Sequence, residues 1–288
     1  MWYRKSLLIL LCCAPLYMAG VTSFSYGQQT SVQVPNLKFT DEPATLSYSF
    51  QHSTPSDPYL INLRTEYRLN EVVAGTKSDY EKVRLISKWV RSRWQHNGNN
   101  EPQKPDPISI LQEAAGGKQF RCVEYSIVLS GALNSLGIPA RVTGLMMQDA
   151  ETRESGAGHV VAEAFLADLQ KWIMVDGQWD VIPVLNGKPL NAVELQLALA
   201  EATPGLTVYS FSGTQPQEYF KWITPYLFYF DTKLDSRLGV ERQPYLRHSE
   251  TLMLVPIGAK EPQVFQRKWP LKNMQYTHSL WVFYAKPT

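Results

Sequence analysis

Three residues have the side-chain types that acyl transfer to sulfur requires. Cys122 supplies a nucleophile, His159 a base that takes or shares the thiol proton, and Asp176 a carboxylate that orients the imidazole and stabilises its charge. The thiolate would attack a carbonyl carbon and form a thioester, which water or an amine then resolves. The sequence therefore predicts a Cys-His-Asp triad, if the fold brings these three residues together.

Cys122 is expected at the start of a buried helix. Gly116 and Gly117 mark a turn before it, and the apolar residues after it recur at helical spacing: Val123, Ile127, Ala132, Leu133 and Leu136. Gly137 suits the left-handed position just past the helix end, and Pro139 prevents the helix from continuing. The predicted helix therefore runs from Cys122 to about residue 136.

The start of this helix is a favourable place for an anion. Unpaired backbone N–H groups and the positive end of the helix dipole stabilise a thiolate over a thiol. Lys118 and Arg121 lie close in sequence and are expected to add to this effect. Cys122 is thus predicted to be a reactive thiol, although a single cysteine on a helix is more often a small hydrophobic core residue.

His159 and Asp176 are predicted to lie on a β-hairpin. The two strands are residues 159–166 and 171–176, with a two-residue turn at Asp168-Leu169. The numbers of paired residues then sum to 337, which places Asp176 diagonal to His159 on one face. Diagonal neighbours are about 7–8 Å apart at the backbone, within hydrogen-bonding reach of these side chains. A slip of one residue would move Asp176 to the other face.

Other histidines do not suggest a second kind of chemistry. His52, His96, His248 and His278 have no ligand-like spacing, so neither a metal site nor a cofactor is predicted. His159 alone would be read as a structural histidine, and Asp176 alone as a turn residue. Their combination with Cys122 favours the triad.

The first residues have the pattern of an export signal. Arg4 and Lys5 precede a short apolar run that Pro15 interrupts before it reaches membrane-spanning length. We expect a signal peptide at residues 1–27, a mature chain that begins at Gln28, and a periplasmic or secreted protein without a transmembrane segment. Lipid attachment at Cys12 or Cys13 is the less favoured alternative.

Removal of residues 1–27 changes both charge and sulfur content. The formal net charge falls from +2 to 0, because Arg4 and Lys5 leave without any acid. A chain without excess charge gives no electrostatic reason to expect nucleic acid or an anionic membrane as a partner. Cys12 and Cys13 also leave, so Cys122 remains without a disulfide partner, which in an exported protein suggests reactivity.

The mature chain of this 288-residue sequence, 44% hydrophobic overall, is divided into three parts. Residues 28–76 are read as a linker and packing segment, residues 77–202 as the catalytic domain, and residues 203–288 as a β-rich, aromatic extension. The sequence also predicts these elements: a capped helix from Ser78, a short helix from Pro107, a strand at 140–147, a loop at 179–190, a helix at 191–202, and strands at 226–230, 251–255 and 280–284.

Four segments together resemble the transglutaminase-like superfamily, whose members are relatives of papain-type cysteine peptidases. They run in order over about sixty residues: Gly117 to Cys122, Leu136 to Val142, Gly158 to Glu163, and Lys171 to Asp176. The resemblance implies an α+β fold in which the cysteine starts a helix packed on an antiparallel sheet that carries the histidine and the aspartate. It also implies that Cys122, His159 and Asp176 are the catalytic residues.

The sequence departs from the family pattern near the two strand residues. Val161 stands where an aromatic often follows the histidine by two, and Gly177 where a proline often follows the aspartate. Neither is a reacting group, so these changes bear on substrate fit. The family's second oxyanion donor is usually upstream of the cysteine, and the candidates here are Trp94, His96 and Gln119, beside the backbone N–H of Cys122.

Three functions are compatible with these residues. The first is an exported cysteine hydrolase that cleaves a peptide or amide bond of a peptide or protein substrate through a thioester. The second keeps the thioester but transfers it to a lysine amine, as a protein-glutamine gamma-glutamyltransferase does in cross-linking. The third is a non-catalytic binding module on the same scaffold that uses its C-terminal aromatic residues as a contact surface.

Overall fold

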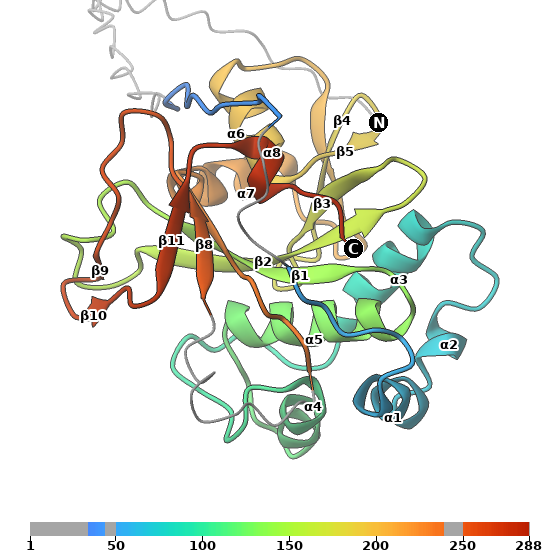
Figure 1. The fold of residues 1–288 in the computed structure, drawn as a ribbon. Helices are drawn as coiled ribbons and strands as arrows, with labels where there is room; N and C mark the ends of the chain where they lie inside the picture. The colour runs from blue at the N-terminus through green and yellow to red at the C-terminus, as the bar shows by residue number, and fades with distance from the viewer. Residues whose placement is uncertain (1–33, 44–49, 239–249, 288) are drawn as a thin grey trace, which may run out of the picture. The chain divides into compact units, whose positions relative to one another are not determined.

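A mixed β-sheet forms the centre of the fold in this computed structural model (Figure 1). The structure describes residues 34–43, 50–238 and 250–287, so the expected signal peptide at 1–27, with Cys12 and Cys13, lies outside the described residues. Residues 34–288 group into one compact unit. Helices and strands together confirm the α+β class expected from the sequence.

The main sheet has six strands within the described residues, in the order β11-β8-β7-β1-β2-β3. Neighbouring strands are antiparallel except for β11 and β8, which are parallel. A second sheet has the order β5-β4-β6, and β9 pairs with β10. The strands are β1 (Ala140–Met146), β2 (Gly158–Leu166), β3 (Lys171–Val175), β4 (Ile182–Leu185), β5 (Lys188–Pro189), β6 (Leu206–Tyr209), β7 (Tyr229–Lys233), β8 (Thr251–Leu254), β9 (Val264–Phe265), β10 (Trp269–Pro270) and β11 (Met274–Thr277).

Helices cover both faces of the main sheet (Figure 1). They are α1 (Pro58–Glu66), α2 (Leu69–Val72), α3 (Asp79–Arg91), α4 (Pro107–Ala115), α5 (Cys122–Ser135), α6 (Ala192–Ala200), α7 (Pro216–Ile223) and α8 (Leu280–Phe283), with a 3-10 turn η1 (Thr224–Tyr226). One apolar core joins α1–α5 to one face of β1–β3, and α5 packs directly on β1 and β2. A second core joins α6, α7 and α8 to the other face and to β7 and β8.

The helix α5 begins and ends where the sequence predicted. Gly137 has φ +82°, and the amide N–H groups of Gly137 and Ile138 donate to the carbonyls of Asn134 and Leu133, the pattern that closes a helix with a left-handed residue. The Asn134 side chain then accepts from and donates to the backbone of Ala140, at 2.9 and 2.8 Å, and so fixes the start of β1 against the helix end. These bonds set the position of α5 on the sheet.

The predicted hairpin register is confirmed. In β2 and β3, Ala162 pairs with Val175 and Leu166 pairs with Lys171, so the paired residue numbers sum to 337 as expected. Asp176 follows β3 directly and forms an isolated bridge with Val181. His159 and Asp176 are therefore on the same side of the hairpin.

Two predictions of local structure were wrong. Residues 280–284, expected as a strand, form the helix α8, because the Ser279 side chain accepts from the N–H of Val282 and caps a helical turn. Residues 179–190, expected as a loop, contain β4 and β5, joined at Asn186-Gly187, where both residues have positive φ. Among its described residues, the segment 28–76, read as a linker and packing segment, contains α1 and α2.

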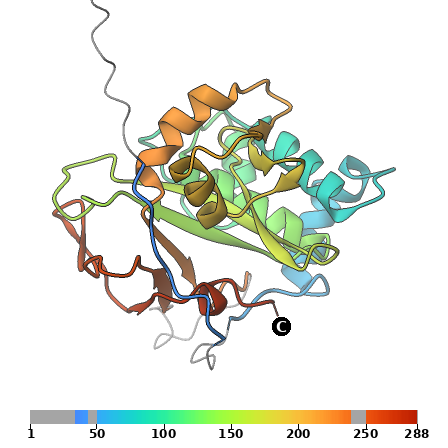
Figure 2. The same cartoon turned by 90° about the horizontal axis from the view of Figure 1, so that it is seen from above.

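Strands from the region after residue 203, which the sequence suggested is a β-rich extension, continue the sheet that carries the hairpin. Strand β7 pairs with β1, and β8 and β11 continue outward. Figures 1 and 2 also show the segment 34–43 running alongside the C-terminal part of the chain, and Thr40 bonds the backbone at 278 and 280. Among the described residues, no helix has the length and apolar character needed to cross a membrane.

Candidate active site

Cys122 is the first residue of α5 and is partly exposed. The turn before it is fixed by Glu124, whose carboxylate accepts from the backbone N–H of Arg121 at 3.1 Å and from its guanidinium at 2.9 Å. Farther along the helix, the Ser126 hydroxyl bonds the carbonyls of Cys122 and Val160. The helix start is thereby tied to the strand that carries His159.

The two basic residues expected to favour a thiolate each bond to a carboxylate. Lys118 pairs with Glu113 at 2.7 Å, and Arg121 pairs with Glu124 at 2.9 Å and also with Glu101. Glu124 is buried, so its pairing with Arg121 also compensates a desolvated carboxylate. The charges of both basic residues are therefore largely balanced. The helix start and His159 remain as the positive groups beside the thiol.

His159 and Asp176 form a buried pair at the end of the β2–β3 hairpin. The imidazole Nε2 lies 2.8 Å from Asp176 Oδ2, and the two side chains are 3% and 0% exposed. Because Nε2 is used in this bond, the other ring nitrogen, Nδ1, is left for the thiol. The diagonal arrangement expected from the hairpin register is thus present.

The surroundings of His159 favour its protonated form. Burial alone would lower the pKa of the imidazole, but the charge of Asp176 and the hydrogen bond to it act against burial. Cys122 acts in the same direction, through a hydrogen bond and through its charge, so the pKa of His159 is raised to about 9. The thiol therefore adjoins an imidazole that carries a proton at neutral pH.

Asp176 is held by three further donors. The backbone N–H groups of Gln178 and Trp179 donate to Oδ1 at 3.0 and 3.2 Å, and the Tyr219 hydroxyl donates to Oδ2 at 2.9 Å. Each carboxylate oxygen thus has two partners, since Oδ2 also bonds His159. A fully hydrogen-bonded carboxylate is stabilised in its charged form in a buried site.

Aromatic side chains from α7 and η1 cover the imidazole. The Trp222 ring meets the His159 ring edge to face, with centroids 4.6 Å apart, and the Tyr226 ring lies 5.9 Å away. Burial and then the charge of Cys122 raise the pKa of Tyr226, so this phenol is also near the thiol. These rings exclude water from one side of the His159–Asp176 pair.

Tyr219, Trp222 and Tyr226 were not predicted from the sequence as site residues. A usable signal was present, because they follow one another at intervals of three and four residues after Pro216, which suits a first helical position. Nothing in that spacing, however, shows that α7 faces the β2–β3 hairpin.

The structure places the three oxyanion candidates differently. Trp94 is buried, its ring stacks on Tyr125 with centroids 4.5 Å apart, and its indole N–H has no hydrogen-bond partner among the described residues. His96 lies on an exposed turn bridged to Phe120, and burial together with the charges of His159 and Arg91 lowers its pKa. Gln119 is exposed, and its backbone carbonyl accepts from Asn100. Trp94 thus contacts Tyr125 of α5, and His96 is close enough to His159 for their charges to interact.

No group of three or more His, Cys, Asp or Glu side chains is arranged to hold a metal ion in the described parts of the chain. The described residues do present a thiol at a helix start, an imidazole with a raised pKa and a hydrogen-bonded carboxylate. This set of groups is suited to nucleophilic attack by sulfur with proton transfer through the imidazole.

Residues 67–177 match the family model of the transglutaminase-like superfamily. The chain therefore contains a transglutaminase-like domain, and Cys122, His159 and Asp176 all lie within the matched residues. This finding confirms the resemblance seen in the sequence. A search of curated proteins finds no match.

Several solved structures show a partial similarity. A proposed cysteine protease from Cytophaga hutchinsonii is 14% identical, with a TM-score of 0.33, and the alignment covers 54% of this chain and 52% of that one. A TGase is 19% identical, with a TM-score of 0.31 and coverage of 42% and 32%. A proposed protease from Parabacteroides distasonis ATCC 8503 is 14% identical, with a TM-score of 0.31 and coverage of 54% and 27%. The aligned part spans about half of the first structure and less of the others.

Proposed function

We propose that the protein is a cysteine hydrolase that cleaves a peptide or amide bond through a thioester on Cys122. In this proposal His159 transfers protons, and Asp176 orients the imidazole and stabilises its protonated form. The observation that supports it best is the buried 2.8 Å contact between His159 and Asp176 beside the thiol that begins α5. The substrate would be a peptide or a protein.

The proposed reaction has two stages. The Cys122 thiolate attacks the carbonyl carbon, and a carbon–sulfur bond forms as the carbonyl oxygen takes negative charge. His159 then gives its proton to the leaving nitrogen, and the carbon–nitrogen bond breaks to leave a thioester. In the second stage His159 takes a proton from water, the resulting hydroxide adds to the thioester, and the carbon–sulfur bond breaks. The thiolate and the imidazolium are restored.

Charge on the carbonyl oxygen needs hydrogen-bond donors. The backbone N–H of Cys122 belongs to the first turn of α5, whose N–H groups have no partner within the helix, and we assign it as the first donor. For the second donor we favour Trp94, because its indole N–H has no partner among the described residues. Its ring also contacts the ring of Tyr125, which lies about one helical turn after Cys122 on α5. Trp94→Phe should then lower kcat by about 100-fold, and an unchanged kcat would exclude this donor.

Peptide products distinguish hydrolysis from its alternatives. The protein is incubated with a peptide mixture and a labelled primary amine, and the products are identified by mass spectrometry. Hydrolysis gives new carboxylates, from chain cleavage or from loss of side-chain ammonia, whereas amine transfer gives label in a new amide. Cys122→Ala should remove both activities. If that variant kept full activity, or if the wild-type protein had none, the proposal would give way to a non-catalytic binding module.

Export is part of the proposal. It is supported by the charged and apolar pattern of the first residues and by the sole cysteine that would remain after residue 27. The measurement is N-terminal sequencing of the protein recovered from the periplasm or the medium. A chain that begins at Gln28 supports signal-peptide cleavage, and a lipid-modified chain beginning at Cys12 or Cys13 supports the alternative.

A further inference from the structure

A cavity of about 540 Å³ lies between α5 and the sheet. Its lining residues do not include Cys122, His159 or Asp176. Much of the wall is apolar and comes from α5, β1 and β2: Val123, Ile127, Val142 and Val160. A cavity of this size, with an apolar wall and polar side chains that include Asp231 and Lys233, has the form of a site for a small ligand.

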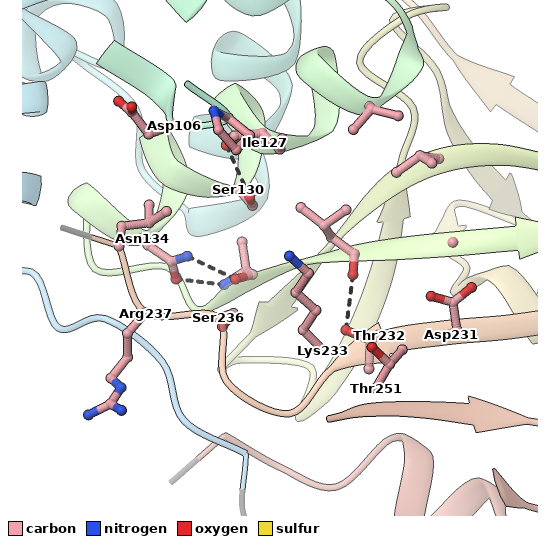
Figure 3. A pocket seen from close by; sticks show the side chains of 17 residues that line it. Asp106, Ile127, Ser130, Asn134, Asp231, Thr232, Lys233, Ser236, Arg237 and Thr251 are labelled. Carbon is pink, nitrogen blue, oxygen red and sulfur yellow. Dashed lines mark hydrogen bonds between the residues drawn. The ribbon is translucent and has the colours of Figure 1, made fainter. Parts of the chain in front are cut away.

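The Asp231 side chain extends from β7 toward β1 on one side of this cavity (Figure 3). Asp231 and Gly144 are paired in the β1–β7 register, and a Cβ added at Gly144 would lie 2.2 Å from Asp231 Oδ2. Any larger residue at position 144 would therefore displace the carboxylate. The glycine leaves the space in which Asp231 faces the cavity.

Asp231 forms no hydrogen bond and no ion pair with any of the residues that the structure describes. Burial raises its pKa to about 6, and Lys233 counteracts part of this effect. Other polar lining groups are already bonded inside the protein: Asn134 bonds the backbone of Ala140, and Thr232 donates to the carbonyl of Val142. Asp231 is partly buried, so its carboxylate loses some hydration without gaining a donor, and a ligand that brings a donor compensates for that loss.

We propose that this cavity binds a primary ammonium group on an apolar stem, with the charge at Asp231 and the stem along Val123, Ile127 and Val160. An anionic ligand would meet the like charge of Asp231, and the two cationic residues that also line the cavity act on carboxylates of the protein: Arg237 pairs with Asp235, and Lys233 acts on Asp231. A wholly apolar ligand would leave the carboxylate without a donor. An ammonium supplies both an opposite charge and hydrogen-bond donors, while its stem covers the apolar wall.

Binding in this cavity is independent of the proposed catalytic function. It requires neither the thiol nor the imidazole, and we therefore test it in the full chain carrying Cys122→Ala. An inactive enzyme with an intact ammonium site is then distinguishable from an active enzyme without one.

The test is calorimetric titration at pH 8 with n-hexylamine, which is charged at that pH, and with 1-hexanol as a neutral match. We expect n-hexylamine to bind at least tenfold more tightly than 1-hexanol. Asp231→Asn should remove this preference, and Gly144→Ala should do the same by displacing the carboxylate. Lys233→Met should tighten amine binding several-fold, because Lys233 competes for Asp231.

Asp235→Asn is the matched control, since Asp235 is a nearby carboxylate that bonds Arg237 and does not line the cavity. It should leave the affinity within twofold of the parent. A second arm compares n-hexylamine with Nα-acetyl-lysine methylamide, and the tighter ligand assigns the site to a free amine or to a lysine side chain. Absence of amine binding, equal binding of hexanol, or unchanged binding in Asp231→Asn would overturn the proposal.

Discussion

Asp176→Asn tests whether the carboxylate keeps His159 protonated. The substitution preserves the size of the side chain and an oxygen that can accept from the backbone N–H groups of Gln178 and Trp179. It removes the charge that, with its hydrogen bond, raises the pKa of His159 to about 9 against the effect of burial. Burial, the largest single influence on this pKa, would then be opposed only by Cys122, and we expect the pKa of the imidazole to fall to its ordinary value of about 6.5 or below.

The size of the effect follows from these two values. The pKa of His159 should fall by roughly 2.5 units, which is about 3 kcal/mol lost by the imidazolium. At pH 8 about 90% of the wild-type imidazole is protonated, against at most about 3% in the variant. If the imidazolium stabilises the thiolate, alkylation of Cys122 by iodoacetamide at pH 8 should slow by about 30-fold or more.

Two measurements check this prediction. An NMR titration follows His159 directly, and the alkylation rate follows Cys122 from pH 6 to pH 10. Asp180→Asn is the control, because Asp180 is a buried carboxylate bonded to Ser87 and Ser212 that has no part in the pKa of His159. A midpoint for His159 that stays above about 8 in Asp176→Asn, or an alkylation rate within threefold of wild type, would refute the reasoning.

The same pair affects stability with a defined sign. The pKa of His159 is higher in the folded chain than in the unfolded chain, where it is about 6.5. Its contribution is therefore fully present below pH 6.5 and is lost as the pH rises toward 9. Over that interval the difference in free energy of unfolding between wild type and Asp176→Asn should shrink by about 3 kcal/mol. Urea denaturation at pH 6 and at pH 9.5 measures it, and a difference that is the same at both would contradict the assignment.

Three further substitutions address other parts of the structure. Tyr219→Phe removes a hydrogen-bond donor to Asp176 and should lower the free energy of unfolding by about 1.5–3 kcal/mol. It should also reduce kcat, and an unchanged kcat would show that this contact is purely structural. Asp231→Asn should stabilise the protein by up to about 3 kcal/mol above pH 7 and by almost nothing near pH 4, because burial raises the pKa of this carboxyl to about 6. Urea denaturation at both pH values measures the difference, and a difference that does not change with pH would contradict this. Gly137→Ala should cost about 1–2 kcal/mol through its positive φ without altering activity, since Pro55 leaves room for the added methyl group; no loss in the thermal midpoint would refute it.

The parts of the site that the sequence predicted depend on local chemistry. Glycine and proline determine the end of α5, and the short connection between β2 and β3 determines their register, so the placement of Asp176 relative to His159 followed from residue numbers. Such features involve residues close together in the chain. Alternatives such as a slip of one residue change which face is buried and are therefore disfavoured.

The parts that the sequence did not predict depend on contacts between distant segments. Tyr219 reaches Asp176 across 43 positions, and Asp231 reaches Gly144 through the pairing of β7 with β1. Lys118 and Arg121 looked like free positive charges, but their partners are decided by side-chain geometry around the turn. Spacing alone specifies none of these partners, because each depends on how elements pack.

The segment beyond the family match completes the environment of the reacting groups. Residues 67–177 contain Cys122, His159 and Asp176, but the rings that cover the imidazole and the hydroxyl that bonds Asp176 come from α7 and η1. This covering has two opposite effects. It removes water, which alone would discharge His159, and it strengthens the attraction of Asp176 by lowering the local dielectric. The pKa of His159 is raised because the charge of Asp176, the hydrogen bond to it and Cys122 together exceed the effect of burial. Because α7 both buries the imidazole and bonds Asp176, it contributes to both sides of this balance as well as to the shape of the site.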